Sequence, residues 1–304
     1  MHHFTDHALC RGARRDGSAV VSAFGKLAVA SRKRSLLCVG LDVDPRLAPP
    51  SLVGNDGWIE RFLLGVVEAT ADLVCAYKPN LAFFEALGIE GYHGLRRTLD
   101  GLPKDVLTIA DAKRGDIGNS AAAYARALFE VWGFDAVTVS PYLGFDTLEP
   151  FLEWDDRGVF VLCKTSNPGS GDLQDLPTSW LGETLPLYEV VARRVAERDR
   201  EGNLGLVVGA TYPRQLARVR ALAPSLPILV PGIGAQQGDL EQSVLAGLDA
   251  AGGGVVANAA RQILYASGGP DWQAAARATA VELRDRLEAA RQERTDAPDR
   301  AAAR

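Results

Sequence analysis

The chain has 304 residues, of which 47% are hydrophobic and 23% charged, a composition typical of soluble globular proteins. Its formal net charge of -5 argues against a general nucleic-acid binder, which would carry a basic surface. No stretch approaches the ~20 apolar residues of a membrane span. The four cysteines lack Cys-x-x-Cys spacing, and three of them lie in apolar runs, which indicates a reducing, cytoplasmic setting.

The two ends of the chain are predicted to lie outside the main domain. Residues 1–22, which include His2, His3 and His7, are expected to form a flexible extension. The segment 18–30 looks like a signal peptide, but Lys26 interrupts its apolar core, so we expect an amphipathic helix packed under the domain. Residues 285–304, rich in Ala, Arg and Glu, are expected to be helical at first and then frayed. Residues 23–284 remain as a single domain.

Short apolar runs recur along this domain and are predicted to be eight strands, at 35–41, 73–78, 106–112, 135–140, 158–164, 204–209, 227–231 and 253–257. Continuous apolar character, rather than strict alternation, is typical of parallel strands covered on both faces. Helical patterns lie between them, at 58–71, 117–132, 183–200, 212–222 and 238–248. Eight βα units in about 250 residues favour an α/β fold of the (β/α)8 TIM barrel type over an open doubly wound sheet.

The third predicted strand runs into "DAKRGDIGNS", residues 111–120, which is unusually rich in charge for the end of a buried strand. In TIM barrels the carboxyl ends of the strands build the active site. Asp111 and Lys113 are two residues apart, so we expect both to point into the barrel mouth. Asp116 lies beyond the strand end, where it could simply cap the following helix.

Other predicted strand ends also carry polar side chains. Asp42 follows the first strand, Lys78 ends the second, and Ser166 lies in the loop 164–172 after the fifth. Taken singly, Asp42 could cap a turn and Lys78 could extend to solvent from the rim. Together with Asp111 they indicate chemistry by Lys and Asp side chains. The sequence offers no metal-ligand cluster, no Ser-His-Asp set and no dinucleotide motif, so we expect neither a metal nor a cofactor.

The last two strand ends predict a phosphate site. The loop after the seventh strand, "PGIGAQQGD" at 231–239, contains Gly232, Gly234 and Gln236, and Arg261 follows the eighth strand. Loops at these positions often hold phosphate through backbone N–H groups, and Arg adds a forked, charge-assisted contact. The glycines also suggest a mobile lid over roughly 231–240.

At "AKRGDIG" the chain resembles the orotidine 5'-phosphate decarboxylases of the bacterial subgroup, whose signature is Asp-x-Lys-x-x-Asp at the end of strand three. The likeness extends in order over most of residues 35–266, through "CVGLDVDPRL", "YKPNLAFFE", "KTSNPGSGDLQDL", "GATYP", "VPGIGAQQGD" and "ANAARQILYA".

The resemblance implies roles for individual residues. Lys78, Asp111, Lys113 and Asp116 match the family's alternating charged tetrad. Asp42 matches the acid that binds a ribose hydroxyl, Ser166 the residue that meets the pyrimidine amide, and Gln236 and Arg261 the phosphate clamp. Asp116, Ile117 and Ser120 match residues that reach into the active site of a second subunit, so a homodimer with shared sites is expected. Ser120 stands where Thr is more frequent and preserves the hydroxyl.

The activity implied by the resemblance is conversion of orotidine 5'-phosphate to uridine 5'-phosphate and carbon dioxide, without a cofactor, in pyrimidine nucleotide synthesis. Two alternatives remain open. Magnesium-dependent sugar-phosphate decarboxylases and aldolases share the barrel and the motif, but they place an acidic metal ligand where this chain has Lys78. A non-catalytic phosphate-ligand binding barrel would have no reason to interleave two lysines with two carboxylates.

Overall fold

Eight parallel strands close into a barrel in the computed structural model, which describes residues 21–233 and 240–302, with side chains to residue 296. Around the barrel the strands are ordered β1-β10-β9-β8-β5-β4-β3-β2. Their bounds are β1 Leu37–Gly40, β2 Ala76–Lys78, β3 Leu107–Arg114, β4 Ala136–Val139, β5 Gly158–Lys164, β8 Leu204–Val208, β9 Ile228–Pro231 and β10 Val255–Ala259. All eight predicted strands and the TIM-barrel fold are confirmed.

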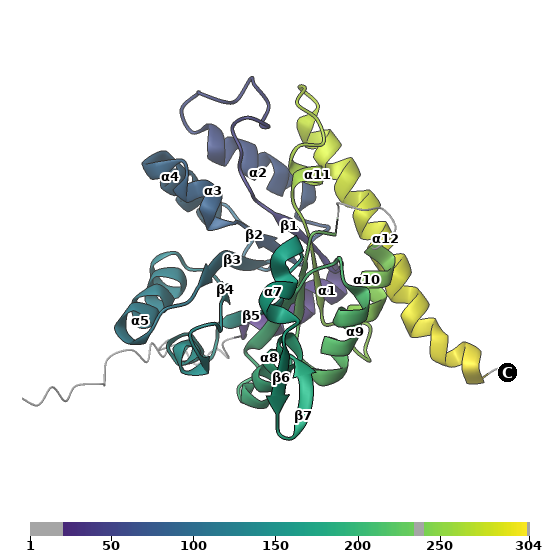
Figure 1. Cartoon of the computed structure of the whole chain (residues 1–304). Coiled ribbons are helices and arrows are strands. Elements are labelled where there is room, and N and C mark those ends of the chain that lie inside the picture. Colours follow the sequence, from purple (N-terminus) through teal and green to yellow (C-terminus); the bar gives the residue numbers. More distant parts are fainter. Residues whose placement is uncertain (1–20, 234–239, 303–304) are drawn as a thin grey trace, which may run out of the picture.

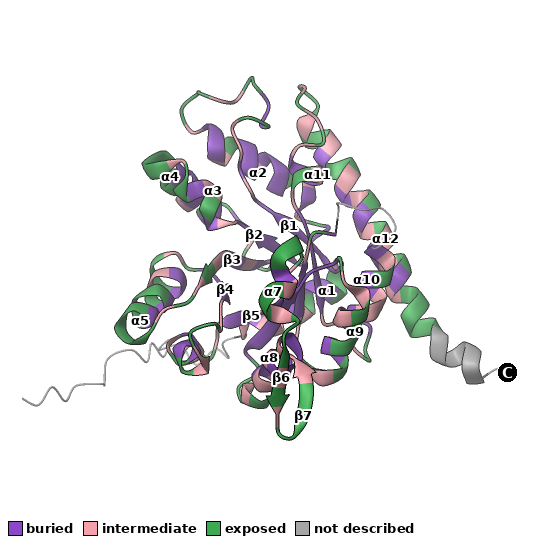
Figure 2. Cartoon of the chain, in the orientation of Figure 1, coloured by how far each residue is buried: buried purple, intermediate pink, exposed green. Residues whose placement is uncertain are grey.

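Helices surround the strands (Figure 1), and the longer ones are α2 Trp58–Thr70, α4 Gly88–Asp100, α5 Gly118–Arg126, α8 Leu187–Arg198, α9 Pro213–Leu222, α10 Leu240–Gly247 and α12 Trp272–Ala302. Shorter turns of helix are α3 Leu81–Glu85, η1 Ala127–Val131, η2 Phe145–Leu148, α6 Glu149–Leu152, η3 Pro168–Ser170, α7 Gly171–Gln174 and α11 Arg261–Leu264. In α2 the apolar residues Trp58, Ile59, Phe62, Leu63 and Val66 recur at helical spacing and are all buried. Figure 2 shows the same division around the barrel, where the strands are largely buried and the helices are exposed on their outer sides.

The helix α1, Ala23–Lys33, closes the amino-terminal end of the barrel, as predicted from the 18–30 segment. It contributes Ala23, Leu27 and Ala30 to a cluster formed with side chains from inside the barrel. The Phe24 ring packs edge-on against Phe160 of β5 at 5.1 Å between centroids. Gly158 makes room for this ring, since a Cβ there would lie 2.7 Å from it. In Figure 1 α1 lies inside the ring of outer helices.

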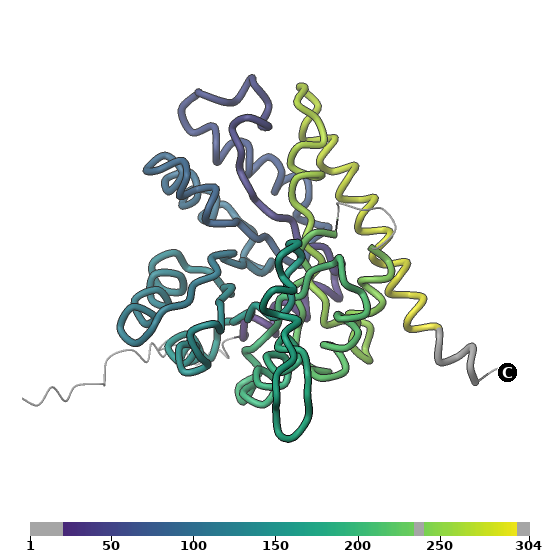
Figure 3. The backbone as a smooth tube through the Cα atoms, viewed as in Figure 1, coloured from purple at the N-terminus to yellow at the C-terminus, as the bar shows by residue number. Residues whose placement is uncertain are grey.

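The helix predicted over 183–200 is wrong in its first turn. Residues 177–186 form a hairpin of β6 Pro177–Trp180 and β7 Glu183–Pro186, and α8 begins only at Leu187. The two turn residues, Leu181 and Gly182, both have positive φ, at 48° and 85°, as a tight two-residue hairpin requires. Pro186 disfavours helix for the residue before it, which keeps β7 extended. Figure 3 shows the hairpin projecting beyond the outer helices.

The predicted boundary at residue 285 does not coincide with the end of an element. Helix α12 runs without interruption through this position, packs on α2 and α10, and buries Leu287 and Ala290 in the core. Core packing therefore extends at least to Ala290. Among the described residues, no helix combines the length and the apolar character that crossing a membrane would require. The predicted extension at 1–22 lies almost wholly outside the described residues.

Candidate active site

The centre of the candidate site is the carboxylate of Asp111, which lies between two ammonium groups. Lys78 Nζ, at the end of β2, donates a 2.6 Å hydrogen bond to Asp111 Oδ2. Lys113 Nζ donates to the other oxygen, Oδ1. The Lys78 side chain is only 3% exposed, whereas that of Lys113 is 49% exposed. The Asp111 carboxylate thus has a buried cation on one side and a solvent-facing cation on the other.

Asp111 and Lys113 form an ion pair, although the regular alternation along a strand that was expected to align them is interrupted here. Lys113 has φ 47°, in the left-handed region, and the pairing of β3 with β4 shifts register between Ala110 and Arg114. Such an irregularity re-aims side chains that alternation alone would fix. The backbone at the strand end is therefore specifically shaped around these two residues.

The charges in this cluster alter one another's protonation. Burial by itself would raise the pKa of Asp111, but the positive charges of Lys78 and Lys113 outweigh it and hold that pKa below its usual value. Burial alone would lower the pKa of Lys78, but the negative charges of Asp111 and Asp42 outweigh this effect and hold that pKa above its usual value. At neutral pH the site accordingly holds an ionised Asp111 carboxylate beside a charged Lys78.

Asp42, just after β1, presents an acceptor without a donor. Its Oδ1 is buried and has no hydrogen-bond partner among the described residues. Burial raises the pKa of Asp42, with the charge on Asp111 adding to it and Lys78 opposing it. The backbone here is fixed by Tyr265, whose Oη donates to Asp42 O at 2.7 Å and accepts from Asp44 N at 2.6 Å. A buried acceptor of this kind is expected to meet a donor from a ligand.

Ser166 lies exposed in the loop after β5, on a segment that Lys164 ties down. The Lys164 side chain is 1% exposed, and its Nζ reaches both carboxylate oxygens of Asp175 at 2.8 Å. The same ammonium lies 4.9 Å from the ring centroid of Tyr212, beyond β8. Gly209 allows the loop to approach, because a Cβ there would be 2.8 Å from Ser166 Cβ. Residues at the carboxyl ends of β5 and β8 therefore together fix the position of Ser166.

The predicted phosphate residues are described only in part. β9 and β10 are neighbours in the barrel, with Pro231 opposite Asn258, so Gly232 and Arg261 follow adjacent strand ends. Gly232 has φ 87°, a conformation that favours glycine, and Arg261 is exposed at the start of α11. Gly234, Gln236 and most of the proposed lid at 231–240 lie outside the described residues.

The remaining predicted residues, among the described part of the chain, make no hydrogen bond or ion pair to the charged cluster. Asp116 Oδ1 accepts a 2.8 Å hydrogen bond from Ile117 N, at the start of α5, and Ile117 and Ser120 are exposed. Within the described part of the chain, Asp116 forms no ion pair with Lys78 or Lys113. The cluster thus brings together three of the four predicted tetrad residues, with Asp42 nearby.

Comparison with known proteins places this geometry in a family. Residues 35–278 match the family described as Orotidine 5'-phosphate decarboxylase / HUMPS. The chain belongs to this family. It is 52% identical over 264 residues to the orotidine 5'-phosphate decarboxylase of Thermomicrobium roseum, covering 86% of this chain and 93% of the relative. The Dehalococcoides mccartyi enzyme of the same name is 49% identical over 257 residues, covering 84% and 93%.

A solved structure of this family has the same fold. The Leishmania donovani OMP decarboxylase superposes with a TM-score of 0.76 at 41% identity, over 89% of this chain and 98% of that one. The family resemblance seen at "AKRGDIG" is thereby confirmed at the level of the whole barrel.

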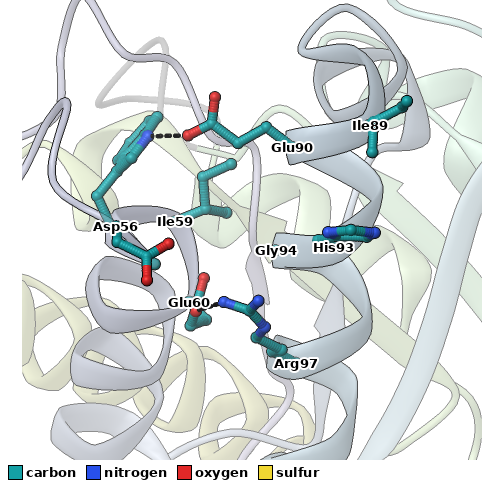
Figure 4. Close-up of a pocket in the computed structure, with 10 residues that line it drawn as sticks. Asp56, Ile59, Glu60, Ile89, Glu90, His93, Gly94 and Arg97 are labelled. Carbon is teal, nitrogen blue, oxygen red and sulfur yellow. Dashed lines mark hydrogen bonds and ion pairs between the residues drawn. The ribbon is translucent and has the colours of Figure 1, made fainter.

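A separate pocket lies on the outside of the barrel, between α2 and α4 (Figure 4), with a volume of about 310 Å³. Its polar side chains are largely engaged with one another, since Trp58 Nε1 donates to Glu90 at 2.8 Å and Arg97 pairs with Glu60 at 2.5 Å. It contains none of the residues predicted for a decarboxylase site. Among the described residues, no cluster of three or more His, Cys, Asp or Glu side chains is arranged to hold a metal ion.

Two polar residues that sequence reasoning did not single out are built into this decarboxylase-family barrel. In the sequence Lys164 is only the last residue of an apolar run, and its partner Asp175 directly follows α7. Thr138 lies inside the short run of β4, where a single Thr is indistinguishable from the β-branched residues around it. Thr138 is recognised only by its hydrogen bonds to β3, and Lys164 only by its contacts with Ser170 and Asp175 in the segment after β5, neither of which a linear pattern displays.

Proposed function

We propose that this chain decarboxylates orotidine 5'-phosphate to uridine 5'-phosphate and carbon dioxide, without a metal or cofactor. The observation that carries the proposal is the Asp111 carboxylate between Lys78 and Lys113 at the mouth of a barrel of this family. Relatives about half identical over most of the chain bear the name of this activity.

In the proposed reaction, Asp111 faces the substrate carboxylate. Two like charges about 4 Å apart repel by roughly 4 kcal/mol at an effective dielectric near 20, and this repulsion ends as carbon dioxide leaves. The bond between C6 and the carboxylate breaks, and its electron pair stays on C6. Lys113 stabilises this developing carbanion and then transfers a proton from Nζ to C6. Lys78 keeps Asp111 ionised and fixed in position.

The remaining parts of the substrate account for the other predicted residues. The unpartnered Asp42 Oδ1 suits a ribose hydroxyl, which is a donor of the kind that this atom lacks. Ser166 is proposed to bind the pyrimidine amide. Arg261 and Gln236, with the backbone at Gly232 and Gly234, are proposed to hold the phosphate. Binding energy from this remote group can be used to organise the site around C6.

We also propose a homodimer in which Asp116, Ile117 and Ser120 complete the partner's site. Support comes from large apolar side chains left exposed in the segment from α5 to the loop after β4, at Ile117 and Tyr124 of the α5 region, Val131 of η1, and Tyr142 and Leu143 after β4. Such a group of exposed apolar residues is typical of an interaction surface. The free, buried Cys38, Cys75 and Cys163 support a reducing, cytoplasmic setting.

The proposal is tested by following the absorbance of orotidine 5'-phosphate with purified protein, with and without EDTA. A Lys113→Ala variant purified in parallel controls for decarboxylase from the expression host. We expect turnover that EDTA leaves unchanged and that the variant loses. Loss of turnover in EDTA would support the metal-dependent alternative. Absence of turnover, with uridine 5'-phosphate still binding, would support the non-catalytic barrel.

A further inference from the structure

The hydroxyl of Thr138, on β4, contacts the segment of β3 that carries Asp111 and Lys113. Its Oγ1 accepts hydrogen bonds from Ala112 N at 3.0 Å and from Lys113 N at 2.9 Å. It also donates to Asp111 Oδ1 at 3.3 Å. The residue is 1% exposed. One hydroxyl thus uses its single donor and both acceptor positions on this strand end.

The backbone at this point depends on an external partner. The β3–β4 pairing shifts register between Ala110 and Arg114, and between them Lys113 adopts φ 47°. A lysine disfavours this left-handed conformation, so the surroundings must stabilise it. In a regular sheet, carbonyl groups of the two neighbouring strands, β2 and β4, would in turn satisfy successive N–H groups of β3. Here the Thr138 hydroxyl takes their place for two successive N–H groups, which would otherwise be left without that partner.

The same hydroxyl restricts the Asp111 carboxylate. Lys78 binds Oδ2, whereas Lys113 and Thr138 both bind Oδ1. The carboxylate is therefore held at both oxygens, and its contact with Thr138 ties it to the turn that presents Lys113. Rotation of the Asp111 carboxylate would break the hydrogen bond that Thr138 Oγ1 donates to it. Relaxation of the backbone at Lys113 would break a hydrogen bond that the same Oγ1 accepts.

We infer that Thr138 is a positioning residue, which sets the relative placement of the Asp111 carboxylate and the Lys113 ammonium. The inference rests on the proposed function, because it concerns the two groups proposed to act at C6. Its consequence is kinetic: a displacement of about 1 Å of a reacting group can cost about 100-fold in rate. Substrate affinity, which depends on the phosphate and ribose contacts, should change little.

The test compares Thr138→Val, which keeps the shape and removes the hydroxyl, with Thr138→Ser, which keeps the hydroxyl. The matched control is Thr108→Val, at the opposite end of β3. The Thr108 hydroxyl also donates to and accepts from a neighbouring residue, with Asp135 Oδ2 at 2.9 Å and Asp135 N at 3.0 Å. Thermal denaturation of every variant measures the structural cost separately from kinetics.

We expect kcat to fall about 100-fold in Thr138→Val, with KM and the Kd of uridine 5'-phosphate within about threefold of the parent. Thr138→Ser should retain most of kcat, and Thr108→Val should lose stability without a comparable loss of kcat. An unchanged kcat in folded Thr138→Val would overturn the inference. So would equal losses of kcat in Thr138→Val and Thr108→Val.

A second readout keeps the inference separate from the proposed function. Removing a donor to the carboxylate should raise the pKa of Asp111, which carboxyl-carbon NMR can follow in Thr138→Val and its parent. If the parent protein does not turn over orotidine 5'-phosphate, the proposed function fails, and an unaltered Asp111 titration would still refute the positioning. If Thr138→Val does not fold, Thr138→Cys replaces it, because a thiol is only a weak donor and acceptor. Its kcat must then fall below that of Thr138→Ser.

Discussion

Lys78 and Asp111 form a 2.6 Å ion pair whose side chains are only 3% and 11% exposed. Each charge would be costly to bury alone, so each residue makes the other tolerable in this position. Breaking such a pair by removing one member is more damaging than removing both, and the first prediction follows from that asymmetry.

Lys78→Met should lower the free energy of unfolding by about 3–5 kcal/mol, because it leaves the Asp111 carboxylate buried with only Lys113 beside it. The double variant Lys78→Met/Asp111→Asn should recover part of that loss while remaining inactive. Urea denaturation of the parent, both single variants and the double variant completes the thermodynamic cycle. Strictly additive single effects would show that the pair is not coupled.

The low pKa of Asp111 predicts a particular dependence of stability on pH. Because its folded-state pKa lies below the unfolded value of about 3.9, ionised Asp111 stabilises the fold above that pH, and this contribution disappears as pH falls through the folded pKa. Asp111→Asn imitates the neutral acid. The difference in unfolding free energy between parent and Asp111→Asn should therefore be constant from pH 7 to about pH 5 and shrink below about pH 4. A difference that grows on acidification would contradict the assignment.

Arg261→Ala should affect the nucleotide and the nucleoside substrates differently. A hydrogen bond to a charged group contributes about 1.5–3 kcal/mol, so kcat/KM for orotidine 5'-phosphate should fall by roughly 10- to 100-fold or more. Turnover of orotidine, which lacks the phosphate, should hardly change. Arg284→Ala, which removes a surface Arg that pairs with Asp285, serves as the control. Equal losses on both substrates would show that Arg261 does not bind the phosphate.

Lys164→Met should release the loop that carries Ser166. The variant removes the contacts to Asp175 and Ser170, so we expect KM for the nucleotide to rise several-fold, as the loss of about 1 kcal/mol of binding free energy would produce. Asp175→Asn should act in the same direction, and the two changes should not be additive. Lys26→Met, which breaks a 2.8 Å ion pair with Asp135 at the closed end of the barrel, is the matched control. A similar KM effect from both lysines would indicate general destabilisation.

Asp116 gives a test of the proposed shared site. Lys113→Ala and Asp116→Asn should each be nearly inactive alone. In a mixed dimer one site inherits both defects and the other inherits neither, so random exchange should leave roughly a quarter of all sites intact. Activity after co-refolding the two variants, compared with each refolded separately, measures this. No recovery, while mass spectrometry detects mixed dimers, would place Asp116 in the site of its own chain.

The sequence predicted the barrel well because each strand is a continuous apolar run, and covered parallel strands leave that pattern wherever they occur. It failed at 183–186, where a local hairpin turn and Pro186 override a helical spacing. Within the candidate site, the approach of Lys78, Asp111 and Lys113 to one another could be predicted because strand ends in a barrel converge. Thr138 could not, since its hydrogen bonds reach a neighbouring strand whose register no linear pattern fixes. Nor could Lys164, since its partners Ser170 and Asp175 meet it only through the folding of the loop that follows β5.

The helix α1 influences the electrostatic field of the Lys78–Asp111 pair at the opposite end of the barrel. Together with Ile109, Phe160 and the other side chains of the interior, it fills the space beneath Lys78 and Asp111 with apolar side chains, which form a medium of low dielectric constant. The field of this pair is therefore poorly screened on its inner side and is concentrated toward the mouth. A substrate that displaces water there completes the insulation, and the same charges then act at a lower effective dielectric. By displacing water, a bound substrate thus strengthens its own electrostatic interaction with Lys78 and Asp111.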